Sequence, residues 1–476
     1  MTTEVFVESY GDEVSRVFIP KKSQGGCAFS SWMPDFDLSW ATFKKFFLPV
    51  GYPSSVSEDY LEYQIWDTIQ AFASSITGAL ASQAVLVGVG VGNSSATILG
   101  ATFTWMFKDG AGMIGRIVFA GYQGSNLDCD CKFWRFVADI LNDCALFLEL
   151  ISPLSDYMFT PILCLANILK SLVGVAGSAT RAAIVQHQAI DNNLADVSAK
   201  DGSQETLSNL MAWFLNFILL YLVTGNQFLI WLSFFICTSL HLYSNYRAVK
   251  CLKMKTFNRT RFHIAVQPWL EQQFLVKSST LLSSMDQSSD DYILISKSFP
   301  QVVWVNHHEP IIQRIDQPRI VFGCSLYSLP IEGQNLLPNL VQLFEEKNNN
   351  YIVYCSNWRA IQQGYSPHDA LTMYIILFSG SGPLDQLKAM LHVELLTFIG
   401  KRNSNVISSY KSIESIINAE SHDEFVQHTL DLVDELWQRL VNSIQSSQQW
   451  NMTSFHFAAD IWRLKVNTNE GKCKEQ

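Results

Sequence analysis

The chain has 476 residues, of which 48% are hydrophobic and only 16% are charged, and its formal net charge is −10. Soluble globular proteins usually carry about 25% charged residues. The high apolar content excludes a disordered chain, and the ten cysteines are too scattered for a disulfide-rich scaffold. The negative net charge argues against a nucleic-acid partner, because phosphate binding requires a basic surface.

We interpret residues 1–65 as a lead-in segment ahead of the first apolar region. The segment from Phe47 to Ser54 contains two prolines and a glycine, which favour an extended or turning path. The first residues are acidic and lack an apolar signal core, so no cleaved signal or transit peptide is evident. Membrane insertion would therefore depend on internal segments.

Residues 66–250 are predicted to form a helical membrane domain. They carry only 21 of the 76 charged side chains. The uncharged stretch from Thr68 to Phe107 is long enough for two helices across a bilayer core of about 30 Å, broken near Val87–Asn93. Glycine, alanine and serine recur every four residues in both halves, a spacing that lets helices pack closely within a membrane.

The clearest membrane signal is the uncharged stretch from Thr206 to Tyr246, which predicts a transmembrane hairpin over 208–224 and 228–245. By the positive-inside rule, the cations that follow the hairpin place the C-terminal part of the chain on the cytosolic side. These cations are Arg247, Lys250, Lys253, Lys255, Arg259 and Arg261. Residues 157–178 are also apolar, whereas 113–122 and 133–151 could lie on or in the bilayer, so the sequence allows four to seven spans.

The segment Gly110-x-Gly112-x-x-Gly115 admits three interpretations. The glycine spacing matches a dinucleotide-binding turn, but the segment follows an apolar helix rather than a strand. We favour a helix break at the membrane edge. Broken helices in transporters also direct charges toward a substrate.

A polar pathway is the functional hypothesis for this region, with an amphipathic helix lying in the membrane interface as its alternative. Residues 133–151 place charged and amide side chains along one side of a helix. The sequence predicts no catalytic residues, no cofactor site and no metal site. The candidate polar contacts are Lys108, Asp109, Arg116, Arg135, Asp139 and Asp143.

Residues 262–476 are predicted to form a smaller soluble α+β domain, so the whole chain is mainly α. Short β-prone runs predict strands at 292–296, 301–305, 319–323 and 351–355. Ser366–Asp369 and the capping box Ser421–Glu424 predict helix starts.

Several long strings, in order, make residues 40–260 resemble the root UV-B sensitive family. They include Trp105-x-x-Lys-Asp-Gly-x-Gly-x-x-Gly-Arg116, Phe133-Trp-Arg-Phe-Val-Ala-Asp139, Thr180-Arg-Ala-Ala183 and Asn193–Glu205. The resemblance implies an integral membrane protein whose plant relatives are associated with seedling development, light responses and pyridoxal-phosphate homeostasis. It also implies complexes between family members, either homo- or hetero-oligomers, but no catalytic residue or agreed reaction.

Three functions are open at this point. The leading hypothesis is a multi-pass, non-enzymatic membrane protein that transports a small polar metabolite or forms an essential part of its transporter. The second is a membrane scaffold whose C-terminal domain recruits partners. The third is a membrane-bound enzyme that uses the Gly110–Gly115 turn for a nucleotide.

Overall fold

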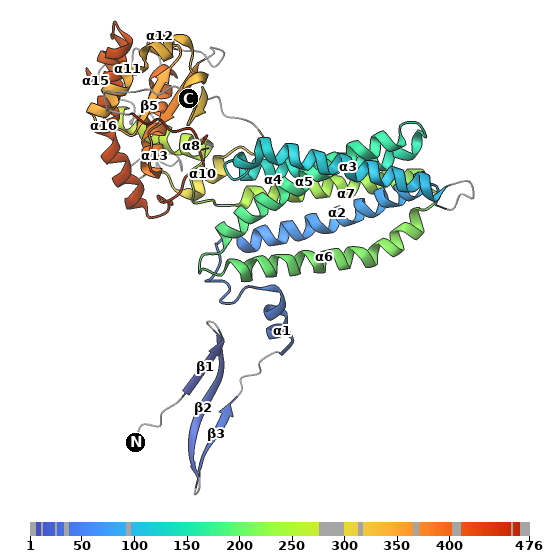
Figure 1. The fold of residues 1–476 in the computed structure, drawn as a ribbon. Coiled ribbons are helices and arrows are strands. Elements are labelled where there is room, and N and C mark those ends of the chain that lie inside the picture. The colour runs from blue at the N-terminus through green and yellow to red at the C-terminus, as the bar shows by residue number, and fades with distance from the viewer. Residues whose placement is uncertain are drawn as a thin grey trace, which may run out of the picture. The chain divides into compact units, whose positions relative to one another are not determined.

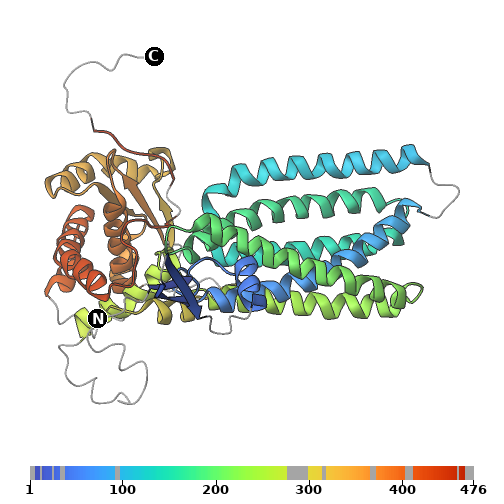
Figure 2. The same ribbon diagram turned by 90° about the horizontal axis from the view of Figure 1, so that it is seen from below.

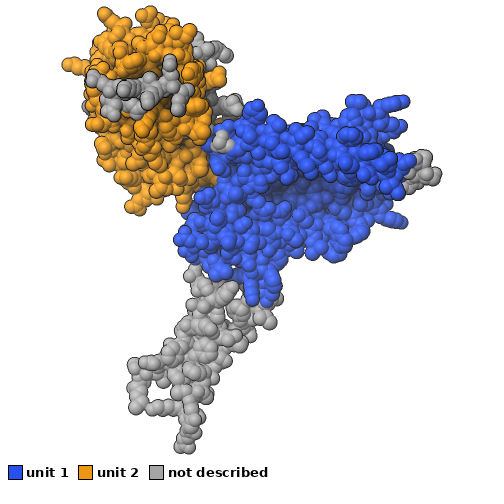
Figure 3. Space-filling view, viewed as in Figure 1, with its two compact units in different colours: residues 1–252 blue, residues 253–476 orange. Residues whose placement is uncertain are grey.

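The computed structural model describes residues 6–10, 13–23, 26–32, 38–91, 97–275, 299–312, 318–364, 371–401, 411–457 and 460–466. The chain forms two compact units, residues 1–252 and 253–476 (Figure 3). Strands predicted at 292–296 and a helix start at 366–369 lie outside the described residues. The two units are mainly helical and α+β, respectively, which confirms the predicted fold class.

Six long helices make up most of the N-terminal unit and run roughly side by side (Figures 1 and 2). Helix α2 packs against α4, α6 and α7, and α5 packs against α3 and α4. The unit begins with a three-stranded antiparallel sheet and a short helix, α1, that contacts α6. The bounds are β1 Phe6–Tyr10, β2 Glu13–Ser23, β3 Gly26–Trp32, α1 Leu38–Phe47, α2 Tyr60–Val89, α3 Ile98–Gln123, α4 Cys131–Ile151, α5 Phe159–Gln188, α6 Leu194–Val223 and α7 Gln227–Cys251.

The two helices and the turn of the predicted hairpin are confirmed, because α6 and α7 are joined by a tight turn at 224–226. Gly225 has a φ of 86°, and the side chain of Asn226 caps α7 by accepting a hydrogen bond from the Leu229 amide at 3.3 Å. Among the described residues, four helices are long and apolar enough to cross a membrane, namely α2, α5, α6 and α7.

The predicted break at Gly110–Gly115 is wrong, because α3 continues through it without interruption. A Cβ atom at Gly112 would lie 2.4 Å from the amide nitrogen of Asn167 on α5, and one at Gly115 would lie 3.0 Å from the hydroxyl of Ser171. The Asn167 amide donates to the Lys108 carbonyl at 2.8 Å. These glycines therefore allow two helices to approach closely, as small residues do in membrane helix pairs.

The C-terminal unit contains a three-stranded sheet of order β4-β6-β5, in which β4 is parallel and β5 antiparallel to the central strand β6. Helix α13 lies in the core, since every side chain from Ala389 to Gly400 is buried. The bounds are α8 Arg259–Leu275, α10 Val302–His308, β4 Arg319–Phe322, α11 Ile331–Glu346, β5 Tyr351–Cys355, α12 Trp358–Gln363, β6 Thr372–Leu377, α13 Pro383–Lys401, α15 Lys411–Ile417 and α16 His422–Ser447.

The strand predicted at 301–305 is wrong, because these residues begin helix α10. Val302 and Val305, three positions apart, are both buried, and the Asn306 side chain bonds the backbone of Met254 through both its amide nitrogen and its carbonyl oxygen, each at 3.0 Å. Tertiary contacts thus override the β propensity of the valines. The strands at 319–322 and 351–355 and the Ser421 cap are confirmed.

The last described residues of the C-terminal unit form backbone hydrogen bonds with residues that come much earlier in its sequence. Residue Asp460 donates its amide to the Phe322 carbonyl at 2.9 Å, and the Leu464 amide donates to the Leu377 carbonyl at 2.8 Å. The Asn451 amide likewise donates to the Lys255 carbonyl at 2.9 Å.

Candidate functional site

The six predicted polar residues divide between two helices. Lys108, Asp109 and Arg116 lie on α3, while the other three lie on α4. The Lys108 amine lies 4.0 Å from Glu149, and Asp109 and Arg116 are exposed. The structure therefore separates the α3 residues from the α4 residues and does not bring all six into one site.

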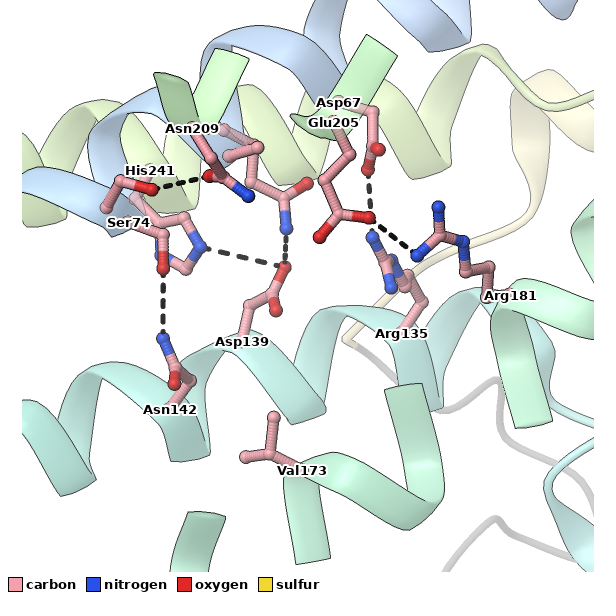
Figure 4. Close-up of a pocket in the computed structure, with 13 residues that line it drawn as sticks. Asp67, Ser74, Arg135, Asp139, Asn142, Val173, Arg181, Glu205, Asn209 and His241 are labelled. Carbon is pink, nitrogen blue, oxygen red and sulfur yellow. Dashed lines mark hydrogen bonds and ion pairs between the residues drawn. The ribbon is translucent and has the colours of Figure 1, made fainter. Parts of the chain in front are cut away.

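A polar cavity of about 380 Å³ lies among α2, α4, α5, α6 and α7 (Figure 4). Arg135 and Asp139 line it, and Asp143 bonds a further lining residue, His241. The remaining charged residues of the lining are Asp67, Arg181 and Glu205. Its lining comes from the early to middle turns of α2, α4 and α6 and the middle to later turns of α5 and α7.

Asp139 is the centre of a buried hydrogen-bond cluster. The side-chain amides of Gln70 on α2 and Asn245 on α7 both donate to its Oδ2 atom. Gln70, Asp139 and Asn245 are 6%, 8% and 0% exposed. Because this carboxylate of α4 accepts hydrogen bonds from α2 and from α7, it joins the three helices.

His241 lies between two carboxylates of α4. Its Nδ1 atom is 2.9 Å from Oδ2 of Asp143, and its Nε2 atom is 3.9 Å from Oδ2 of Asp139. One turn of helix separates the two aspartates, which allows both to face the same ring. The carboxylates are 8% and 5% exposed and the histidine only 1%.

The two arginines of the cavity each have their own carboxylate partners. Arg135 contacts Asp67 at 2.8 Å. The Nε and Nη1 atoms of Arg181 contact Asp201 and Glu205 of α6, each at 2.6 Å. Two arginines thus tie α4 to α2 and α5 to α6, and their positive charge is largely neutralised.

Three buried acceptor oxygens around Asp139 have no hydrogen-bond donor among the described residues. They are Oε1 of Gln70, Oδ1 of Asn245 and Oδ1 of Asp143. Unpartnered buried polar atoms cost about 1–3 kcal/mol each, so they are rare in native interiors. Of these three residues only Gln70 lines the cavity, so its Oε1 atom is the acceptor that a ligand there could reach.

Sequence reasoning missed the partners contributed by α7 and α2. Residues 206–246 contain no Asp, Glu, Lys or Arg, so His241 and Asn245 passed as part of an apolar run. These two residues are four apart and therefore share one face of the helix. This polar pair on one face of an apolar helix could have indicated the site from the sequence. Gln70, in the uncharged stretch from Thr68 to Phe107, could have done the same.

Lys108 belongs to a second, smaller charge cluster in the N-terminal unit. Glu149 is 3% exposed at its side chain and lies 2.6 Å from Lys170. The Lys108 amine also lies 4.4 Å from the centre of the Trp105 ring, close enough for a cation–π contact. The cluster links α3, α4 and α5 outside the cavity.

The C-terminal unit has a separate buried polar cluster between α8 and α13. His263 Nδ1 lies 2.6 Å from Glu394 Oε2, and Gln267 donates to the same oxygen at 2.7 Å. Burial alone would raise the pKa of Glu394, but the charge and hydrogen bond of His263 outweigh it and hold that pKa below its usual range. These groups satisfy one another and join two core helices.

Two family models match the chain. The Vitamin B6 photo-protection and homoeostasis domain matches residues 36–273, and the C-terminal domain of root UVB sensitive protein matches residues 298–466. No solved structure matches the chain.

Among similar proteins, RUS family member 1 of Dictyostelium discoideum is 50% identical over 243 residues, which cover 50% of this chain and 46% of that protein. Protein root UVB sensitive 3 of Arabidopsis thaliana is 35% identical over 373 residues, 78% of this chain and 79% of that protein. Protein root UVB sensitive 6 of the same plant is 30% identical over 251 residues, 53% of this chain and 50% of that protein. The chain thus spans about half the length of the first and third relatives.

Proposed function

Since the chain belongs to the root UV-B sensitive family, we propose that it spans a membrane and transports a small polar metabolite of the vitamin B6 group, or forms an essential part of that transporter. The name of the N-terminal family domain supports the metabolite class. The geometry of the cavity supports a ligand-handling role.

The outer surface of the helical unit supports a bilayer location. Large apolar side chains are exposed along α3, α6 and α7, among them Phe107, Ile117, Phe217, Ile218 and Phe235. Soluble monomers rarely expose contiguous apolar patches beyond a few hundred Å². Helices of 25 and 30 residues also exceed the ~20 residues needed for one crossing. The cations after α7 favour a cytosolic location for the C-terminal unit.

The single observation that carries the proposal is a charged cavity inside a bundle with an apolar exterior. Ionisable residues within membrane helices usually mark a substrate or ion pathway. Cavities of about 300–1,000 Å³ are typical of small-molecule sites, and this one is about 380 Å³. Asp139 lies eight residues into α4, about 12 Å along the helix axis from its start.

Uptake into proteoliposomes tests the proposal directly. The purified chain should take up pyridoxal, pyridoxamine or pyridoxal 5′-phosphate above the rate of protein-free vesicles. Asp139→Asn removes the charge that organises the cavity and should reduce uptake about tenfold or more, since charged hydrogen bonds contribute about 1.5–3 kcal/mol.

Asp191→Asn provides the matched control, because it makes the same chemical change at an exposed position outside the cavity. It should leave uptake unchanged. Equal uptake by the wild type and Asp139→Asn, at equal protein level and insertion, would refute a role for Asp139 in transport.

A scaffold that recruits partners is the alternative, and the C-terminal unit favours it. This unit has its own family match and its own hydrophobic core. Deletion after about residue 262 separates the hypotheses. A transporter should retain uptake in vesicles, whereas a scaffold would lose its cellular function together with its partners.

A further inference from the structure

The ring of His241 is held where each of its nitrogens faces a carboxylate. Nδ1 lies 2.9 Å from Asp143, and Nε2 lies 3.9 Å from Asp139. A neutral imidazole has one N–H donor and one acceptor, so it would direct a lone pair at one of these anions. An imidazolium donates from both nitrogens, so it can bond Asp143 through Nδ1 while its Nε2–H faces the negative charge of Asp139.

Two hydrogen bonds offset part of the cost of burying a charged Asp139. Two side-chain amides, from Gln70 and Asn245, donate to the same Oδ2 atom that Nε2 of His241 faces. The side-chain oxygens of both amides have no hydrogen-bond donor among the described residues. Donors that converge on one oxygen stabilise a carboxylate over a protonated acid.

Arg135 and Arg181 are the other cations near the ring, and both are paired with further carboxylates. On α4, Arg135 pairs with Asp67 of α2 and also acts electrostatically on Asp139. On α5, Arg181 lines the same cavity but pairs with two carboxylates of α6, Asp201 and Glu205. Besides His241, helix α7 contributes the neutral amide of Asn245 to the cluster. His241 therefore shares Asp139 with Arg135 but bonds Asp143 directly, and Oδ1 of Asp143 is a buried acceptor without a donor among the described residues.

We propose that His241 is a proton-binding site that joins α7 to α4, and that its protonation is coupled to the occupancy of the cavity. His241 and Asp139 line the cavity, so a proton from solvent can reach the ring through it. That proton forms the second ring N–H bond. Loss of that proton to water leaves two buried carboxylates facing a neutral ring, which weakens the α4–α7 contact. A cationic ligand group in the cavity then offsets the negative charges of Asp139 and Asp143. The coupling, though not the proton site, rests on the proposed transport function.

Nitrogen-15 NMR of the full chain in lipid nanodiscs, labelled at its ten histidines, tests the proton site without any substrate. His241→Gln identifies the signals of His241 by their loss. We expect both ring nitrogens to be protonated at about pH 7. In Asp143→Asn the ratio of doubly to singly protonated rings should fall at least tenfold, because an adjacent carboxylate shifts such a pKa by about one to three units.

His308→Gln is the matched control, because it removes an exposed histidine and should leave the His241 signals unchanged. If His241→Gln does not fold, the one histidine signal that responds to both Asp143→Asn and Asp139→Asn identifies the site. A ring that is neutral at pH 7 in the wild type, or that is insensitive to both aspartate substitutions, overturns the proposal.

Uptake with and without an imposed pH gradient then tests the coupling. A proton-coupled carrier should change its initial rate severalfold with the gradient, and His241→Gln should abolish that dependence. Uptake that ignores the gradient refutes the coupling and leaves the transport function intact. A doubly protonated ring without uptake of any B6 compound supports the proton site and refutes the transport function.

Discussion

In the C-terminal unit one large apolar core fills the interior, whereas the helical unit has smaller apolar clusters, a polar cavity and many exposed apolar side chains. Helix α13 buries Leu391, Leu395 and Phe398, while α6 exposes Phe217 and directs polar side chains inward. The difference is the one expected if the helical unit lies in a membrane, as we propose. Water drives apolar groups together, but a lipid environment has no such preference, and helices there associate through close packing and polar contacts.

The largest expected effect comes from truncating one phenylalanine in each unit. Phe398→Ala should destabilise the C-terminal unit by about 3–5 kcal/mol, because it leaves a cavity in a packed core. Phe217→Ala, at a side chain that is 60% exposed, should cost less than about 1 kcal/mol in lipid. Hydrogen exchange of peptides from each unit in nanodiscs measures both. Equal losses would mean that the outer face of α6 is packed against protein.

A smaller effect is expected from closing the gap between α3 and α5. Gly112→Leu places a side chain where Asn167 lies and should cost about 1–3 kcal/mol, as overpacking does. Gly121→Leu on the same helix meets nothing within 4 Å and serves as the control. Unfolding of the two variants by dodecyl sulfate compares them. Equal stability would show that the two helices do not depend on their close approach.

The smallest expected effect, taken per pH unit, is a pH dependence in the C-terminal unit. Burial, with a smaller contribution from Lys388, lowers the pKa of His392 to about 3. The unfolded chain binds a proton at His392 with a pKa of about 6.5, whereas the folded chain binds it only near pH 3. As the pH is lowered from 6.5 to 3, the free energy of unfolding should therefore decrease by about 1.4 kcal/mol per pH unit. His392→Gln should flatten this slope by one proton, whereas His308→Gln should not. Chemical denaturation at several pH values measures the slope, and an unchanged slope in His392→Gln contradicts the assignment.

Elements with strong local signals were predictable from the sequence. The turn at Thr224–Gln227 interrupts a long apolar run, and the Ser421–Glu424 capping box marks the start of α16, so both follow from short-range chemistry. Residues 301–305 show the opposite case. Their β-branched side chains favour a strand, and only contacts with Met254, distant in sequence, make them helical.

The candidate site was only half predictable for the same reason. Periodicity placed Arg135, Asp139 and Asp143 on one face of α4, and they do share a cluster. The sequence could not show that α7 supplies the facing histidine, because the pairing depends on how the helices pack. It also could not show that Gly112 marks a close helix contact rather than a break.

The hydrogen bonds that residues 451–464 make with residues 255, 322 and 377 have a consequence for the timing of synthesis. Chains are extended at about 5–20 residues per second, so residues 451–464 follow Lys255 by on the order of 10–40 seconds. Until residues 451–464 are made, the Phe322 carbonyl of β4 lacks its hydrogen bond from Asp460, and the Lys255 carbonyl lacks its hydrogen bond from Asn451. The helical unit has by then been complete since residue 252 and can already fold. The chain therefore completes its two units in sequence, and a chaperone that shields the open end of β4 would act after the first unit is complete.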